Sequence, residues 1–426
     1  MAERRLIDDC FLTDSERLRH DEALTILRER VGPVVDEETV ALGEALGRIL
    51  AEPVFSPRAV PSCDNAAVDG YAYAHADFAV AAGVFPVHAR IAAGHPSPLP
   101  HQAGTAARIF TGAAMPVGAD TVAMQEDCDI RVENGRDVVA VPAGLKRGAN
   151  RRKAGEDLAE GAIVAAAGMR LRPQEIAAIA STGQDAVGVF RRLRVALVST
   201  GDEIVRPGAP LGPGQVYDSN RFLLGALIES VDCEIVDAGI LRDDEKAVRD
   251  ALLALAATTD AVLTTGGASR GEEDHLVASL DTLGQRHLWQ LAVKPGRPMS
   301  LWQIGNCPVV ALPGNPVAAF VCFLLYVRPM LTVMGGGLWP EPQRFQVPAA
   351  FEIATRKTGR REFLRGRMVR DENGQTVVEK FLRDGSGLIT SLREADGFIE
   401  ITEDVLAVRP GDPVTFLPFS GLGLAP

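Results

Sequence analysis

The chain has 426 residues, which is too long for one hydrophobic core and indicates about two to four domains. Hydrophobic residues make up 46% of the chain and charged residues 23%, which is the balance of an ordinary soluble globular protein. The net charge of -12 at pH 7 argues against a general nucleic-acid binder, because such a protein needs a basic face.

Cysteine usage and the apolar runs indicate the cellular compartment. The six cysteines are scattered and lack the paired spacing of a metal site, so we expect reduced, mostly buried thiols. The N-terminus is charged and lacks the apolar segment of a signal peptide. The longest apolar run, Val317 to Val327, is shorter than the roughly 20 residues that span a bilayer. We therefore predict a cytoplasmic protein without a membrane segment.

The first 52 residues contain two amphipathic pieces, Asp21–Arg28 and Leu42–Leu50, which we predict to be helices. A polar stretch from Pro61 to Ala72 follows; taken alone it has the composition of a turn, although it contains the carboxylate of Asp69. From Phe85 to Val141, short runs of strand-forming residues are separated by Gly, Pro and Asn, which predicts a small β-domain.

A basic run, Arg147–Asp157, comes next, and such runs usually form a solvated face. It is followed by a predicted helix, Pro173–Thr182. Because amphipathic segments flank the β-domain on both sides, we expect them to pack together as one discontinuous domain. The predicted boundaries are 1–60 with 155–190 for this elongated linker domain, and 61–154 for the inserted β-domain.

Residues 191–338 have the rhythm of repeated βαβ units. A strand is predicted at Leu193–Thr200, a helix capped by Ser219 or Asn220, a second strand at Glu234–Leu241, a helix led by Asp243, and a third strand at Asp260–Thr265. Strands that alternate with helices in this way form a parallel sheet that is covered on both faces. The predicted central domain is therefore a doubly wound α/β domain.

The loops that follow these strands carry glycines, carboxylates and cations. In such sheets ligands bind beyond the carboxyl ends of the strands. Glycine-rich turns allow backbone N–H groups to approach an anion, and Lys294 and Arg297 add full positive charges. Nearby carboxylates are explained if Mg2+ lies between the protein and a phosphate, because Mg2+ takes oxygen ligands. We infer a phosphorylated, nucleotide-like ligand that is held together with a metal.

After a Pro-rich linker, residues 339–426 contain five β-like runs and no segment with helical periodicity. These runs are Arg344–Phe351, Glu362–Val369, Thr376–Phe381, Gly397–Thr402 and Asp412–Leu417. Short strands at this spacing predict a compact C-terminal β-barrel. The predicted fold class is thus α/β multidomain, with four structural parts.

Five loop motifs occur in order in the central region: Ser199–Glu203, Tyr217–Asn220, Gly266–Asp274, Lys294–Pro298 and Leu312–Val317. Together they resemble the signature loops of the molybdopterin molybdenumtransferases, the MoeA and gephyrin E-domain family. The resemblance extends to Pro61–Ala72, Phe110–Gly112, Arg152–Asp157, Phe363–Gly366 and Gly385–Ser386. The chain departs from the family pattern at several loop positions, none of them a proposed ligand: Ala66, Val68, Ala268, Arg270, Glu273, His275 and Gly387.

The resemblance implies a homodimer with a shared active site, which inserts molybdate into adenylylated molybdopterin with Mg2+-dependent release of AMP. The implied catalytic residues are Asp69, Glu203, Asp274, Lys294 and Arg297, and the implied metal ligands are Asp202, Glu203 and Asp274. The implied molybdate ligands are Arg365 and Ser386. The implied substrate-binding residues are Thr111, Asp157, Thr200, Asp202, Asp218, Gly266, Gly267, Ser269, Pro313, Gly314, Asn315 and Pro316.

Two other functions remain open at this point. A binding or scaffolding protein with the same fold would retain the pterin site without turnover. A related transferase would act on another nucleotide-linked anion, or on tungstate in place of molybdate. Carboxylates and cations on one rim favour the enzyme, because a scaffold has no physical need for them. We expect neither nucleic acid nor membrane as a partner.

Overall fold

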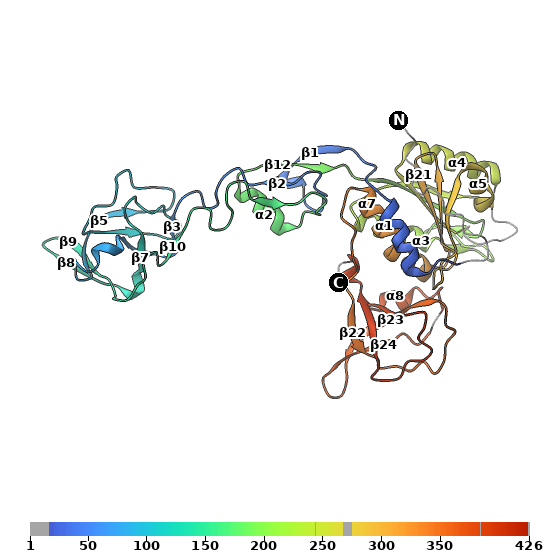
Figure 1. The fold of residues 1–426 in the computed structure, drawn as a ribbon. Coiled ribbons are helices and arrows are strands. Elements are labelled where there is room, and N and C mark those ends of the chain that lie inside the picture. Colours follow the sequence, from blue (N-terminus) through green and yellow to red (C-terminus); the bar gives the residue numbers. More distant parts are fainter. Residues whose placement is uncertain (1–16, 243, 267–274, 384, 425–426) are drawn as a thin grey trace.

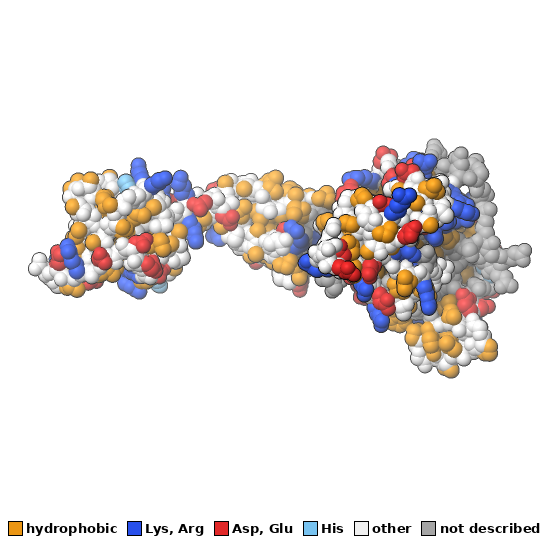
Figure 2. Space-filling model, turned by 90° about the horizontal axis from the view of Figure 1, so that it is seen from below, with side chains coloured by type: hydrophobic (Ala, Val, Ile, Leu, Met, Phe, Trp, Pro, Cys, Tyr) orange, Lys and Arg blue, Asp and Glu red, His pale blue; other side chains and the backbone are white. Residues whose placement is uncertain are grey.

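The computed structural model describes residues 17–242, 244–266, 275–383 and 385–424. The molecule is elongated, with a small β-sheet unit at one end and the central sheet and C-terminal region at the other (Figure 1). On the face shown in Figure 2, acidic and basic side chains are interspersed along the molecule. Among the described residues on this face, neither charge sign forms an extended region.

The central sheet has the strand order β16-β13-β17-β21-β20-β18. The parallel strands are β13 (Arg194–Thr200), β16 (Glu234–Leu241), β17 (Ala261–Thr265) and β21 (Cys307–Leu312), which confirms the three predicted strands. β20 (Ser300–Ile304) pairs antiparallel with β21 and with the edge strand β18 (Gln285–Trp289), so the expectation of a parallel sheet was wrong for these two strands. The reason is local, since only two residues separate β20 from β21 and so short a turn reverses the chain.

Alternate residues of β13 enter different cores. Val195 and Leu197 pack with α3 (Ser219–Ser230), whereas Ala196 and Val198 pack with α4 (Glu245–Thr258) and α5 (His275–Leu283). The sheet is thus covered on both faces, as predicted. The helix caps differ from the prediction: Asp218 accepts a hydrogen bond from the Arg221 N–H (3.0 Å) and caps α3, and Asp244 accepts one from the Ala247 N–H (2.7 Å) and caps α4.

The apolar run after β21 forms one continuous helix from Pro316 to Met334, made of α6 (Pro316–Cys322), a π-helical turn (Phe323–Val327) and α7 (Arg328–Met334). Among the described residues it is the one helix whose length and composition would suffice to cross a membrane. However, 83% of its most apolar window is buried inside the protein, as in the core helix of a soluble protein.

The N-terminal segment confirms one predicted helix and corrects the other. α1 (His20–Arg30) is helical, but residues 42–50 are not: β1 (Glu37–Ala41) leads into a 3-10 turn (Leu42–Glu44) and then into isolated bridges. Gly43 and Gly47 disfavour a helix, and the backbone groups of this segment bond to distant ones, such as the Leu171 carbonyl, which accepts from the Gly47 N–H (2.8 Å).

Strand pairing joins this segment to residues 163–190. β1 pairs with β12 (Ala186–Phe190), and β2 (Val54–Phe55) pairs with β11 (Ile163–Ala165), beside the helix α2 (Pro173–Ser181). Two stretches that are more than 100 residues apart therefore build one unit between the small β-sheet and the central sheet (Figure 1).

The small β-sheet has the order β7-β4-β6-β5-β9-β8. The short strands predicted between residues 85 and 141 are confirmed as β5 (Val84–Ile91), β6 (Ala106–Ile109), β7 (Thr121–Met124), β8 (Asp129–Glu133) and β9 (Arg136–Ala140). β4 (Gly70–Tyr73) was missed, because Asp69-Gly70 reads as a turn. All four of its residues are buried, and a Cβ on Gly70 would lie 1.9 Å from the Ala123 carbonyl oxygen. Glycine is therefore required at Gly70 by the neighbouring strand.

The basic run contributes β10 (Arg151–Arg152), paired with β3 (Asn65–Ala66).

The C-terminal strands agree with the five predicted runs: β22 (Phe345–Pro348), β23 (Arg361–Arg370), β24 (Thr376–Lys380), β25 (Gly397–Ile401) and β26 (Pro413–Pro418). Their sheet has the order β19-β23-β25-β26-β22, with β24 paired to β23, and β19 (Val293–Lys294) joins it from the central region. The expectation that this region contains no helix was wrong, since α8 (Thr390–Arg393) forms one helical turn. The closed barrel stays a prediction.

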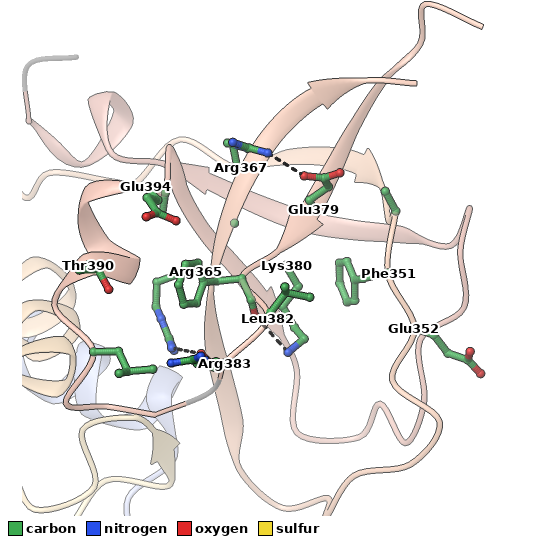
Figure 3. Close-up of a pocket in the computed structure, with 15 residues that line it drawn as sticks. Phe351, Glu352, Arg365, Arg367, Glu379, Lys380, Leu382, Arg383, Thr390 and Glu394 are labelled. Atoms are coloured by element: carbon green, nitrogen blue, oxygen red, sulfur yellow. Dashed lines mark hydrogen bonds and ion pairs between the residues drawn. The ribbon is translucent and has the colours of Figure 1, made fainter. Parts of the chain in front are cut away.

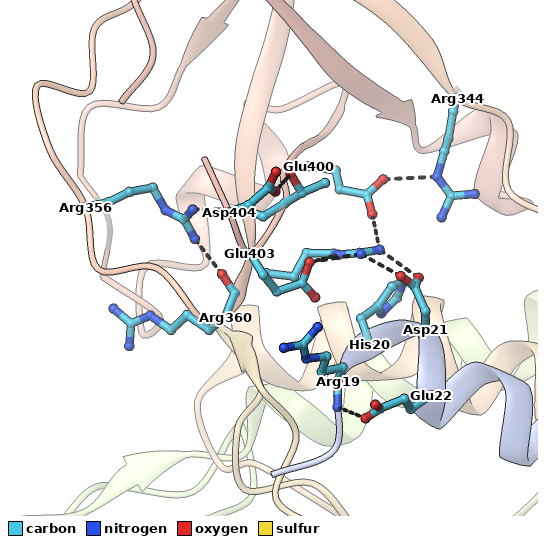
Figure 4. Close-up of polar contacts among 12 residues, drawn as sticks. Arg19, His20, Asp21, Glu22, Arg344, Arg356, Arg360, Glu400, Glu403 and Asp404 are labelled. Atoms are coloured by element: carbon cyan, nitrogen blue, oxygen red, sulfur yellow. Dashed lines mark hydrogen bonds and ion pairs between the residues drawn. The ribbon is translucent and has the colours of Figure 1, made fainter. Parts of the chain in front are cut away.

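α1 is attached to the C-terminal sheet by an ionic cluster around Arg361 of β23, in which Arg361 and Glu400 are buried and Asp21 is exposed. The Arg361 guanidinium bonds to Asp21 (2.7 Å), Glu400 (3.0 Å) and Glu403 (3.0 Å). Figure 4 shows His20 and Asp21 on α1 facing Glu400 and Glu403. His20 is fully buried, with Nδ1 2.7 Å from the Tyr326 hydroxyl, and burial lowers its pKa to about 3.

The neutral His20 predicts a specific loss of stability in acid. In the unfolded chain His20 binds a proton below about pH 6.5, whereas in the folded chain it stays neutral down to about pH 3, so this contribution to stability falls as the pH drops through that window. Between pH 7 and pH 5 the loss is about 2 kcal/mol. Urea unfolding at pH 7 and pH 5 measures the loss of unfolding free energy between the two pH values, and this loss should be about 2 kcal/mol smaller in His20→Gln than in the wild-type protein. An equal loss in both proteins would contradict the prediction.

Candidate active site

The loops after the parallel strands converge on Asn220, the second residue of α3. Its Nδ2 donates to the Thr265 Oγ1 at the end of β17 (2.8 Å) and to the Gly314 carbonyl after β21 (2.7 Å). The side chain is buried, at 8% exposure. Asn220 therefore joins three elements of the rim. Sequence reasoning missed this role because Asn220 was considered only as a helix cap; its signal is the Tyr217–Asn220 motif.

Close backbone packing holds the same turns together. Gly266 has φ +91°, and a Cβ there would lie 2.7 Å from the Thr200 carbonyl oxygen and 3.1 Å from its Oγ1. A Cβ on Gly314 would contact the Gly266 Cα at 3.7 Å. The structure therefore brings together the predicted residues Thr200, Gly266 and Gly314, and only glycine fits at Gly266.

Several polar atoms at this rim have no hydrogen-bond partner within the described parts of the chain. They are the Ser199 Oγ, the Asp218 Oδ2 and the Asn220 Oδ1, all on buried residues. Unpaired buried acceptors are costly, by roughly 1–3 kcal/mol each, unless a ligand or water satisfies them. Asp218, predicted to bind substrate, keeps one carboxylate oxygen for capping α3 and the other unpaired.

Two of the predicted metal ligands follow β13 directly. Asp202 and Glu203 are exposed, and Glu203 folds back over Gly201, whose Cβ would lie 2.6 Å from the Glu203 Oε2. The third, Asp274, lies outside the described residues, as do Gly267 and Ser269. Among the residues that the structure does describe, no group of three or more His, Cys, Asp or Glu side chains could hold a metal. The metal site therefore stays a prediction.

A cationic pocket lies on the other side of the Pro313–Pro316 turn. It is a cavity of about 230 Å³, and its lining includes six predicted residues: Lys294, Pro313, Arg297, Asn315, Arg365 and Ser386. It also includes Arg17 and Arg360, which sequence reasoning missed. Among the described residues that line it, none is a carboxylate. The arrangement is suited to a small anion.

Pairing between distant segments builds this cationic pocket. Leu18 bridges Leu291, and the Ala292 N–H donates to the Leu18 carbonyl (2.8 Å), which places Arg17 beside the Lys294–Pro298 loop. The Val317 N–H of α6 donates to the Ser386 carbonyl (3.1 Å) and fixes the Ser386 loop against the Pro313–Pro316 turn. Neither contact has a sequence signal, so Arg17 could not have been found from the sequence.

Arg365 lines two cavities. One is the cationic pocket, and the other is an open cavity of about 750 Å³ in the C-terminal region, drawn in Figure 3. The side chain is 2% exposed; Nε donates to the Ser391 Oγ (3.0 Å) and Nη2 to the Arg383 carbonyl (2.8 Å). These bonds hold the loop that carries Ser386. The predicted molybdate ligand thus also supports the wall of its pocket.

The remaining predicted residues lie in the small β-sheet unit and its connection. The Asp69 Oδ1 accepts from the Thr111 N–H (2.8 Å) and hydroxyl (2.7 Å), and these bonds lower the pKa of Asp69. Asp157 is exposed, and its N–H donates to the Val60 carbonyl (3.0 Å). Within one chain this unit lies far from the central rim (Figure 1), so one chain does not bring Asp69, Thr111 and Asp157 to it.

Comparison with known families covers nearly the whole chain. Residues 18–183 match the model of the MoeA N-terminal region (domain I and II), residues 196–333 that of the "Probable molybdopterin binding domain", and residues 346–419 that of the MoeA C-terminal region (domain IV). The chain belongs to the MoeA family.

Individual relatives agree with this MoeA assignment. The molybdopterin molybdenumtransferase of Haemophilus influenzae is 36% identical over 403 residues, which cover 94% of this chain and 98% of the relative. That of a Nostoc species is 38% identical over 309 residues, covering 71% and 70%. The crystal structure of a molybdopterin biosynthesis MoeA protein from Pyrococcus horikoshii matches with a TM-score of 0.80 and 28% identity, covering 95% and 100%.

Loss of the Asn220 amide should loosen the rim of this MoeA protein. Asn220→Ala leaves the Gly314 carbonyl and the Thr265 hydroxyl without their donor, so we expect about 1–3 kcal/mol of lost stability in urea unfolding. Asn306→Ala, in the exposed β20–β21 turn, is the matched control and should change stability by less than about 0.5 kcal/mol. Equal effects of the two substitutions would show that Asn220 does not join the rim.

Proposed function

We propose that this chain inserts molybdate into adenylylated molybdopterin, with Mg2+-dependent release of AMP, to give the molybdenum cofactor. The observation that carries the proposal is the placement of the Pro313–Pro316 turn between two sites. Gly314 lies beside Gly266 on the glycine-rich rim, where an added Cβ on Gly314 would be 3.7 Å from the Gly266 Cα, while Pro313 and Asn315 line the cationic pocket. An organic phosphate on the rim and an oxyanion in the pocket would therefore be neighbours.

The cationic pocket fits molybdate in size and charge. Its volume of about 230 Å³ is below the range of about 300–1,000 Å³ that is typical for organic ligands. Lys294 and Arg297 supply charge and N–H donors, and Ser386 supplies a hydroxyl. Charge-assisted hydrogen bonds of this kind are about twice as strong as neutral ones. Arg365 would hold the Ser386 loop and present its cationic edge to the same anion.

The rim fits the diphosphate of the pterin substrate. The glycines Gly201, Gly266 and Gly314 would allow the backbone N–H groups of these turns to approach an anionic ligand closely. The exposed carboxylates of Asp202 and Glu203, with Asp274, would hold Mg2+. When bound, Mg2+ would neutralise the charge on the phosphate oxygens. The chain's own groups would then position the dithiolene sulfurs next to molybdate.

We further propose that the active site is completed by a second copy of the chain. Asp69, Thr111 and Asp157 lie far from the rim within one chain, so a partner subunit in a homodimer would have to supply them. The proposed domains are 1–60 with 155–190, 61–154, 191–338 and 339–426. We place the protein in the cytoplasm, with neither nucleic acid nor membrane as partner.

The central test of this proposal is AMP release. Purified protein with adenylylated molybdopterin, Mg2+ and molybdate should release AMP, and omission of molybdate or Mg2+ should suppress it. Substrate that stays bound without AMP above background would identify a binding or scaffolding protein. Equal turnover with tungstate would show that the pocket selects charge and shape rather than the metal.

The shared site is tested by complementation. Asp69→Asn and Glu203→Gln each alter a different surface of the proposed composite site, so each variant alone should be nearly inactive. After unfolding and refolding as an equal mixture, half of the dimers would carry one intact site, and about a quarter of the wild-type activity should return. Light scattering should show a dimer throughout. An active monomer, or no recovery in a mixture that refolds to dimers, would contradict a shared site.

A further inference from the structure

Behind the wall of the cationic pocket lies a single carboxylate that sequence reasoning did not select. Glu362, in β23, is 5% exposed. β19 runs parallel to β23 in a register that pairs Lys294 with Glu362. The Glu362 Oε2 is 3.3 Å from the Lys294 Nζ, so the pairing of the strands is also a pairing of charges.

Two further cations contact the same carboxylate. The Glu362 Oε1 is 3.4 Å from the Arg360 Nε and 3.5 Å from the Arg356 Nε. The side chains of Lys294 and Arg360 are each 38% exposed and line the pocket, whereas Arg356 is 5% exposed and does not. Glu362 therefore lies between one buried cation and two that face the proposed substrate.

Arg356 is fixed independently of Glu362. Its Nη1 donates to the Thr402 carbonyl (2.8 Å) and the Val405 carbonyl (2.5 Å), and Nη2 donates to the Arg360 carbonyl (2.5 Å), a contact that Figure 4 shows. Lys294, by contrast, has a flexible stem, and an ammonium group can turn in many directions. Without a carboxylate between them, three cations at this spacing would repel one another. The carboxylate of Glu362, which contacts the fixed Arg356, can thus orient the flexible Lys294.

We propose that Glu362 is a positioning residue that holds Lys294 and Arg360 on the wall of the oxyanion pocket. This inference rests on the proposed function, because it takes molybdate as the ligand. The carboxylate does not touch the anion; it acts by directing the Lys294 ammonium and the Arg360 guanidinium. It also leaves the five-residue cluster of Glu362, Lys294, Arg297, Arg356 and Arg360 with a net positive charge, so the pocket still attracts an anion.

The test is Glu362→Gln, which keeps the shape of the side chain and removes its charge. A purely electrostatic role predicts tighter molybdate binding, since one negative charge near the pocket is lost. The positioning role predicts the opposite sign: KM for molybdate should rise about tenfold, as expected for the loss of one charge-assisted hydrogen bond, with KM for the pterin substrate unchanged. Glu379→Gln removes an exposed carboxylate that pairs with Arg367 and is the matched control, with unchanged kinetics.

A double-mutant cycle shows whether Glu362 acts through Lys294. Lys294→Ala should itself raise KM for molybdate, and Glu362→Gln added to it should have a clearly smaller effect than in the wild-type protein, because only the contact with Arg360 is then left to lose. Glu362→Asp keeps the charge on a shorter side chain and should therefore bind molybdate more tightly than Glu362→Gln does, but less tightly than the wild-type protein. If Glu362→Gln does not fold, Glu362→Asp is used in its place.

The outcomes separate the two proposals. If the wild-type protein turns over and Lys294→Ala weakens molybdate binding, but Glu362→Gln leaves KM unchanged or lowers it, the positioning role is wrong and the pocket stands. Full additivity in the cycle would also overturn it. If molybdate neither binds the wild-type protein, by calorimetry, nor supports AMP release, the oxyanion pocket itself is rejected, and the role of Glu362 falls with it.

Discussion

Backbone contact between the turns after β13, β17 and β21 is the constraint on which the proposed site depends. Gly266 packs against the Thr200 carbonyl, Gly314 packs against Gly266, and the buried amide of Asn220 bonds across the last two strands. A side chain at Gly266 would push the turns apart. The glycine turns are thus held by close backbone packing and by one buried side-chain amide, and the cations that line the pocket take no part in these contacts.

The charge of the cationic pocket is opposite in sign to the net charge of the whole chain. The whole chain carries a net charge of -12, yet the described residues that line the cationic pocket include five basic side chains and no acidic one. Screening over about 8 Å lets a small basic region coexist with an acidic protein. The carboxylate of Glu362 contacts three cations, two of which line the pocket. Its burial places the negative charge where it can direct cations without meeting an anion.

Long-range pairing unites parts of the chain that are distant in sequence. The N-terminal segment enters beside the Lys294 loop through the bridge between Leu18 and Leu291, and α1 is then attached to the C-terminal sheet by Arg361. The small β-sheet unit, in contrast, extends away from the rim (Figure 1). The same chain therefore builds the cationic pocket from distant segments but keeps Asp69 and Thr111 of the small β-sheet unit away from it.

Short-range pattern determined most of the elements from the sequence alone. Alternation of apolar residues located the strands of both β-sheet regions, and the order of glycine, carboxylate and cation motifs indicated both the family and the rim. These signals are local, since each depends on residues within one strand or turn. The family resemblance added the positions of Arg365 and Ser386, which the structure places in one pocket with Lys294.

Tertiary structure decided what local pattern could not express. Leu42–Leu50 has helical periodicity, but its backbone groups bond to residues near 170 and 190, and those pairings outweigh a weak helical preference at two glycines. β4 became a buried strand because neighbours on both sides supply its ladder, although Asp69-Gly70 alone favours a turn. Asn220, Arg17 and Glu362 gained their positions from partners that are distant in the sequence or from strand register. Which distant groups meet is set by burial and register over the whole fold, and no single stretch of sequence contains that information.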